Sequence, residues 1–92
     1  MNLQGIRKIG NSCTGRVALS YKMLVQKIGP PNVTDLDDES KVKASWGLED
    51  IDTGRRMFIW CYEYKFPESC NDWSADGCPS LLREAFGSYY YR

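Results

Sequence analysis

The chain has 92 residues, with 12 basic and 12 acidic side chains, no histidine and 42% hydrophobic residues. This length predicts one domain, residues 1–92, around one hydrophobic core. A net charge of zero argues against a dedicated nucleic-acid-binding protein, which usually carries a basic excess. Without histidine, a nucleophilic serine or cysteine lacks its usual neighbouring base.

Charge is distributed unevenly along the chain. Residues 1–34 carry five basic side chains and no acidic one, and residues 35–52 carry seven acidic and two basic ones. Residues 53–92 carry five of each sign. Two interpretations stay open: the charges belong to solvated loops, or they form two opposite patches, one of which faces a partner.

No segment has the apolar run of a signal peptide or of a membrane span, so a cytoplasmic protein without a membrane partner is expected. In that compartment Cys13, Cys61, Cys70 and Cys78 are reduced thiols. Their spacing contains no C-x₂₋₄-C pair, so we expect no metal and no other cofactor. The exception would be Cys61, Cys70 and Cys78 meeting together with a carboxylate.

The first elements in chain order are a loop or an irregular N-terminal strand over residues 5–15, a short strand over 15–19 and a helix over 20–28. Ser20 is a suitable N-cap. Tyr21, Leu24, Val25 and Ile28 form one apolar stripe at helical spacing. Gly29 and the two prolines after it end the helix.

A hairpin follows the acidic segment. Residues 41–49 alternate strictly, and residues 55–65 form the return strand after a turn containing Asp52 and Gly54. The inward-facing side chains of the first strand are Val42, Ala44, Trp46 and Leu48. The apolar stripe of the helix is expected to pack against these four side chains.

Residues 66–80 are expected to form a long loop, and a second helix follows from Pro79 to a stop at Gly87. The resulting order is β-α-β-β-α, with two short helices. The predicted fold class is therefore α+β, with a small antiparallel sheet.

The strand over residues 58–65 is apolar on both faces, because Phe58, Trp60, Tyr62 and Tyr64 alternate with Ile59 and Cys61. One face takes the first helix. The other is covered either by the loop and tail of residues 66–92 or by another chain, which includes a homodimer.

The predicted partner-binding residues are the acidic side chains of residues 35–52 and two aromatic ones on the return strand: Asp35, Asp37, Asp38, Glu39, Glu49, Asp50, Asp52, Trp60 and Tyr62. The acidic residues lie at both ends of the strand over 41–49, so they belong either to two ordinary polar loops or to the two ends of a ridge. Such a ridge suits the basic surface of a nucleic-acid-binding protein. No pattern of catalytic residues is present, so we expect no enzymatic activity.

The stretches "SYKMLVQKIGPP", "KVKASWGLED", "FIWCYEYK" and "DWSADG" together resemble a family of small tailed-phage accessory proteins of mostly unknown function. The family pattern is a SYxxLxxxFGxP helix, a strand ending in tryptophan, an IYxYK hairpin strand and a downstream DW. The acidic loop, Cys61 and the absence of a histidine after Trp73 depart from it. The resemblance implies a phage protein that acts in the bacterial cytoplasm by blocking a host protein, such as a CRISPR-Cas component.

Two other functions remain open. Arg7, Lys8, Arg16 and Lys22, together with Trp60 and Tyr62, would suit a nucleic-acid-binding accessory protein if the aromatic face were exposed. A structural or assembly protein of the virion is the third class.

Overall fold

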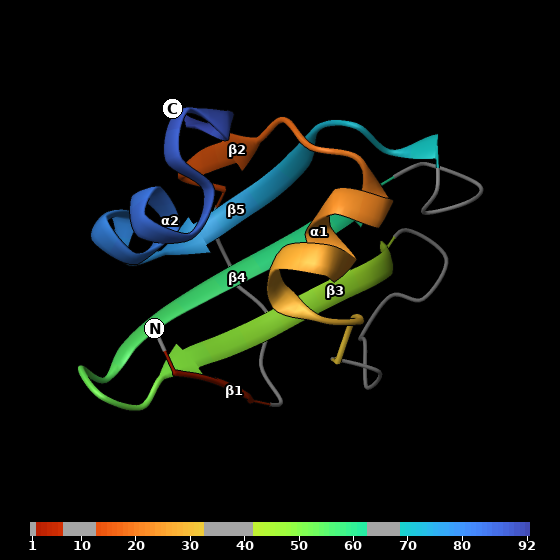
Figure 1. Cartoon of the computed structure of the whole chain (residues 1–92). Helices are drawn as coiled ribbons and strands as arrows, with labels where there is room; N and C mark the ends of the chain where they lie inside the picture. Colours follow the sequence, from red (N-terminus) through yellow and green to blue (C-terminus); the bar gives the residue numbers. More distant parts are fainter. Residues whose placement is uncertain (1, 7–12, 33–41, 63–68) are drawn as a thin grey trace.

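The computed structural model describes residues 2–6, 13–32, 42–62 and 69–92 (Figure 1). They form one six-stranded sheet with neighbouring strands in the order β1-β3-β4-β5-β2-β6, and every pair is antiparallel. The elements are β1 (Leu3–Gly5), β2 (Gly15–Val17), α1 (Tyr21–Ile28), β3 (Val42–Asp50), β4 (Arg55–Tyr62), β5 (Trp73–Gly77), α2 (Pro79–Phe86), a 3₁₀ turn η2 (Gly87–Tyr89) and β6 (Tyr90–Tyr91). The predicted α+β class with an antiparallel sheet is confirmed.

Helix α1 begins and ends where its sequence predicts. The Ser20 hydroxyl accepts a hydrogen bond from the Met23 N–H at 3.3 Å, and Gly29 ends the helix with a positive φ of 85°. Leu24 is fully buried, and the other three residues of the predicted stripe pack partly buried against the core.

Two tryptophans fix this helix to the sheet, which an eight-residue helix needs because it is unstable alone. Trp73 Nε1 donates to the Leu19 carbonyl before α1 (2.8 Å), and Trp46 Nε1 donates to the Gly29 carbonyl after it (2.9 Å). The two indole rings meet edge to face with centroids 5.3 Å apart. Both indole N–H groups are thus satisfied inside the core.

Helix α2 covers the same face of the sheet as α1 (Figure 1). Pro79 occupies its first turn, and Gly87 ends it with a positive φ of 57°, as predicted. Leu81, Leu82 and Phe86 are buried in the cluster that also contains Trp46, Trp73 and Leu24. One main core therefore lies between the sheet and the two helices.

The hairpin is confirmed where the structure describes it. Trp46 pairs with Ile59 and Leu48 with Met57, so these four side chains face the helices. Gly54 has a φ of 76° in the turn. The register shifts between Val42 and Ala44. The side chains of Val42, Ala44 and Tyr62, and residues 63–65, lie outside what is described.

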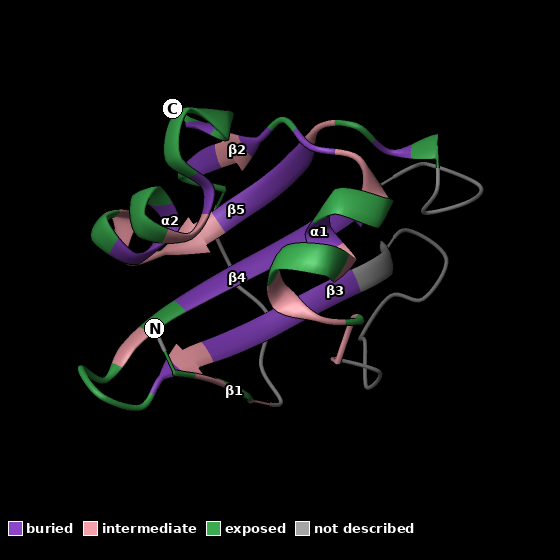
Figure 2. Ribbon diagram, viewed as in Figure 1, coloured by how far each residue is buried: buried purple, intermediate pink, exposed green. Residues whose placement is uncertain are grey.

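The second face of β4 has its own small cluster. Phe58 and Trp60 are 7% and 3% exposed, and Ile6 packs against them. Burial along β4 is visible in Figure 2. Residues 66–92 or a second chain were expected to provide this cover, so the contact from Ile6, next to β1, was not anticipated.

The predicted order β-α-β-β-α contains three strands, whereas the described residues form six. The predicted strand count was therefore wrong. The segment expected as a loop over 66–80 contains β5, a central strand between β4 and β2. Its sequence "WSADG" has no β-branched residue and, apart from Trp73, no residue type that is enriched in strands. Strands β1 and β6 are three and two residues long, too short for a recognisable alternation.

Candidate protein-binding site at the β3–β4 hairpin tip

The four residues that join β3 to β4, residues 51–54, are all exposed and project from one end of the sheet (Figures 1 and 2). We refer to them as the hairpin tip. Ile51 is 49% exposed, the largest value among the exposed large hydrophobic side chains that the structure describes. The tip therefore combines an exposed apolar side chain with the neighbouring exposed Asp52.

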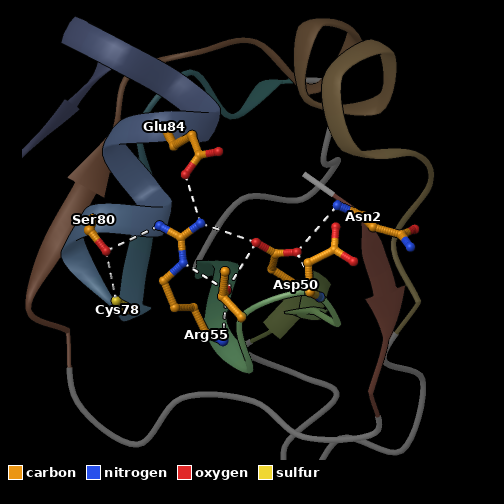
Figure 3. A network of polar contacts seen from close by, with 8 residues as sticks. Asn2, Asp50, Arg55, Cys78, Ser80 and Glu84 are labelled. Atoms are coloured by element: carbon orange, nitrogen blue, oxygen red, sulfur yellow. Dashed lines mark hydrogen bonds and ion pairs between the residues drawn. The ribbon is translucent and has the colours of Figure 1, made fainter.

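Asp50 holds the base of the hairpin tip (Figure 3). Its Oδ1 accepts hydrogen bonds from the N–H groups of Asn2 (3.3 Å) and Asp52 (3.2 Å). Its Oδ2 accepts from the Thr53 hydroxyl (3.0 Å) and from Arg55 Nη2 (3.1 Å). The side chain is only 3% exposed. A buried carboxylate with this many donors fixes the turn that starts at its own residue.

The same contacts decide the protonation of Asp50. Burial alone raises its pKa, but hydrogen bonds from the Asn2 N–H, the Thr53 hydroxyl, Arg55 and the Asp52 N–H outweigh burial and hold the pKa of Asp50 below its ordinary value. Asp50 is therefore a carboxylate at neutral pH.

Arg55 connects the hairpin tip to α2. Its Nη2 donates to Glu84 Oε2 (2.7 Å) as well as to Asp50, its Nε donates to the Thr53 hydroxyl (2.9 Å), and its Nη1 donates to the Ser80 hydroxyl (3.2 Å). One planar guanidinium thus ties the turn to a helix that is itself anchored in the main core.

These bonds give the tip a fixed shape before any partner arrives. A surface that is already ordered loses less conformational entropy on binding than a mobile loop. Chemically, the tip can insert an apolar side chain into a pocket and place a carboxylate beside a cation. No ion pair to Asp52 occurs among the described residues.

The predicted acidic ridge is only partly on the described surface. Glu49 accepts a hydrogen bond from Arg56 Nε at 2.7 Å, Asp50 is buried, and Asp52 is exposed at the tip. The other predicted acidic residues, Asp35, Asp37, Asp38 and Glu39, lie outside the described residues, so whether they form the far end of a ridge stays a prediction.

Of the two predicted aromatic contact residues, Trp60 and Tyr62, the structure describes only the side chain of Trp60. Trp60 is almost completely buried in this conformation, so a partner would reach it only by displacing its cover. The side chain of Tyr62 lies outside the described part. Their part in partner binding stays a prediction.

Sequence reasoning missed Ile51, Arg55 and Glu84. A signal for Ile51 exists, because an isoleucine inside the turn "DIDTG" has no strand face on which to be buried. Glu84 gives no such signal, because it lies 29 residues from Arg55 and meets it only through the fold.

Three of the cysteines lie in or against the main core, and one of these, Cys78, also contacts a polar side chain. Cys61 and Cys70 are buried in the main core, and Cys78 packs partly buried against it. Within residues 2–6, 13–32, 42–62 and 69–92, no group of three or more His, Cys, Asp or Glu side chains is placed to hold a metal ion. The Cys78 sulfur lies 3.1 Å from the Ser80 hydroxyl, which lowers the pKa of Cys78 together with the Leu81 and Ser80 N–H groups and the charge of Arg55.

Comparisons of the chain with protein-family models, with curated proteins and with solved structures found no match. Across the described residues, no helix is both long and apolar enough to cross a lipid bilayer.

Proposed function

We propose that this protein is a phage-encoded, non-enzymatic inhibitor that binds a protein of the bacterial host in the cytoplasm and blocks its activity. The target class that suits it best is a nucleic-acid-binding defence protein, such as a CRISPR-Cas component. The observation that supports the proposal is the braced hairpin tip, which presents Ile51 and Asp52 on an ordered turn.

The composition of the tip fits such a target. A groove that binds nucleic acid is lined by Lys and Arg side chains, which attract a carboxylate placed at its mouth. An apolar side chain beside that carboxylate adds burial, and binding energy in interfaces concentrates in a few such residues. The phage origin and the class of target rest on the resemblance of the chain's motifs to small tailed-phage proteins.

The proposal is tested by capture from a bacterial host lysate on immobilised protein, followed by identification of the retained protein. The wild-type chain is compared with Ile51→Lys, which replaces apolar contact by charge, and with Met23→Lys, the same kind of change at another exposed apolar side chain, on α1. We expect Ile51→Lys to weaken binding of the purified target at least about tenfold. Met23→Lys should keep the wild-type affinity, and both variants should keep the wild-type melting temperature.

Three results would contradict the proposal. One is a wild-type chain that captures no host protein, and another is equal binding by both variants. The third is tight binding of DNA or RNA in a gel shift with steep salt dependence, weakened evenly by Arg7→Glu, Lys8→Glu and Arg16→Glu, which would favour the nucleic-acid-binding alternative. Recovery of the chain from purified phage particles would favour the virion alternative.

A further inference from the structure

Every hydrogen-bond donor of the hairpin tip points inward and is occupied. The first N–H of the tip donates to the Asn2 carbonyl (3.0 Å), and the Asp52 N–H donates to Asp50 Oδ1 (3.2 Å). The N–H groups of Thr53 (3.2 Å) and Gly54 (2.7 Å) both donate to the Asp50 carbonyl, and the Thr53 hydroxyl donates to Asp50 Oδ2 (3.0 Å). The tip, all of which the structure describes, therefore has no free donor to offer a partner.

The carbonyl groups of the same turn point the other way. The peptide bonds of the tip are trans, and in a trans peptide the C=O of one residue lies antiparallel to the N–H of the next. The N–H groups of residues 52–54 point toward Asp50, so the carbonyls of residues 51–53 point away from it. Within the described part of the chain, no group donates a hydrogen bond to these carbonyls.

Asp52 adds a charged acceptor to the exposed surface of the tip. Its side chain forms no ion pair with any described cation. The outer surface of the tip thus combines the apolar side chain of Ile51 with carbonyl oxygens and one carboxylate. It can accept hydrogen bonds but cannot donate them.

This polarity restricts the chemical groups that can bind. A phosphate group presents acceptor oxygens, so at the tip it would meet other acceptors and no donor. An amide or hydroxyl can donate, but it carries no charge to match Asp52. Arginine and lysine side chains donate only and are positively charged at neutral pH.

Of these two, arginine fits the tip better. Its guanidinium holds five N–H donors in a planar fork and can bridge several acceptors, whereas the lysine ammonium group is a compact and strongly hydrated charge. Weaker hydration also favours the guanidinium beside Ile51, which is 49% exposed. At the base of the same hairpin, the Arg55 guanidinium already bridges Asp50, Thr53 and Glu84 in this way.

We propose that the hairpin tip binds an arginine side chain of its target, with the guanidinium between the Asp52 carboxylate and the outward carbonyls of the turn. This inference rests on the proposed function for the existence of a target and adds the group that the tip recognises in it. In a protein that binds nucleic acid, arginine side chains contact phosphate groups. The tip and the nucleic acid then compete for the same side chain.

Small probes test this recognition on the isolated full-length chain. Isotope-labelled protein is titrated separately with N-acetyl-arginine amide, N-acetyl-lysine amide, inorganic phosphate and calcium chloride, and the main-chain amide resonances are followed by NMR. A hydrogen bond to a carbonyl shifts the amide nitrogen resonance of the next residue. Arginine amide should therefore shift residues 52–54 with half-saturation on the order of 10 mM, and lysine amide should need at least about threefold more. Phosphate should leave these resonances unchanged.

Asp52→Asn removes the charge and keeps the N–H group that donates to Asp50. It should raise the half-saturation concentration of arginine amide at least about fivefold. Asp76→Asn is the matched control, because its carboxylate lies on β5 and accepts from the Thr14 hydroxyl (3.3 Å). This control should bind arginine amide as the wild type does. Melting temperatures within about 2 °C of the wild type show that both variants fold.

The inference is overturned if arginine amide gives no saturable shift at residues 52–54, if phosphate binds there as tightly, or if Asp52→Asn binds arginine amide as the wild type does. Calcium that produces the same shifts at a lower concentration than arginine amide would assign the oxygen atoms of the tip to a metal ion instead.

Binding of the captured target separates this inference from the proposed function. Asp52→Asn should weaken target binding at least about fivefold. If Ile51→Lys weakens target binding and Asp52→Asn does not, the proposed function stands and the arginine site is wrong. If arginine amide binds as expected and the wild-type chain captures no host protein, the proposed function is wrong and the recognition of arginine by the tip stands.

Discussion

Two arginine–aspartate pairs occupy different regions of the sheet, and the shorter one is the more exposed. Arg16 Nε lies 2.8 Å from Asp72 Oδ2, with both side chains 41% exposed. Arg55 Nη2 lies 3.1 Å from Asp50 Oδ2, with the aspartate 3% exposed. The comparison shows that the distance between two charges is a poor guide to how much the pair stabilises the fold, because water screens an exposed pair.

The two pairs also differ in the number of hydrogen bonds that the aspartate side chain accepts. Asp50 accepts four hydrogen bonds and fixes the hairpin tip. The Asp72 side chain accepts hydrogen bonds from Arg16 and from the Tyr91 hydroxyl (2.8 Å). These two bonds link β2 and β6 to the segment before β5. That hydrogen bond from Tyr91 to Asp72 raises the pKa of Tyr91. The first pair shapes a turn, and the second joins strands that the sheet already pairs.

The largest expected effect comes from removing the buried carboxylate. Asp50→Asn should lower the melting temperature by about 10 °C, because it removes one of the two carboxylates that pair with Arg55 and places an amide NH₂ group against donors that the carboxylate accepted from. Thermal unfolding followed by circular dichroism measures this.

The matched change in the exposed pair is Asp72→Asn, which should lower the melting temperature by no more than about 3 °C. Equal losses in the two variants would show that burial does not distinguish the pairs.

A smaller effect is expected from pH. Because the pKa of Asp50 is lower in the folded chain, its carboxylate stabilises the fold fully above the unfolded pKa of about 3.9. This stabilisation is lost as the pH falls below that value and through the folded pKa. The difference in melting temperature between wild type and Asp50→Asn should therefore be constant from pH 7 to about 5 and shrink below about pH 4. A difference that stays constant down to pH 2 would contradict this.

The smallest expected effect concerns the thiol at the end of the Arg55 network. Since the Ser80 hydroxyl is the main cause of the lowered pKa of Cys78, Ser80→Ala should shift the pH midpoint of Cys78 alkylation by iodoacetamide upward. Mass spectrometry of the labelled peptide measures the midpoint. Ser88→Ala, at an exposed serine in η2, should leave it unchanged. An unshifted midpoint in Ser80→Ala would mean that the hydroxyl does not stabilise the thiolate.

The elements that could be predicted are those with local signals. Ser20 and Gly29 bound α1, Pro79 and Gly87 bound α2, and the alternation before and after Gly54 gives the hairpin. Each signal acts over a few residues, because caps, turns and apolar stripes depend on neighbours in the chain.

The candidate site was predictable only in part. The sequence pointed to Asp50 and Asp52 as acidic residues of one turn, but it did not distinguish a buried carboxylate from an exposed one. That distinction depends on Asn2, which reaches Asp50 from 48 residues away, and on α2, which supplies Glu84 to Arg55.

The sequence by itself determined the α+β class, the two helices and the hairpin, because these follow from local hydrogen bonding and from the period of apolar residues. Only the tertiary structure decided that Trp73–Gly77 is a central strand, since its sheet partners Met57 and Arg16 come from distant parts of the chain. It also decided which carboxylate is buried. These properties arise from contacts between remote segments, which no local pattern of residues encodes.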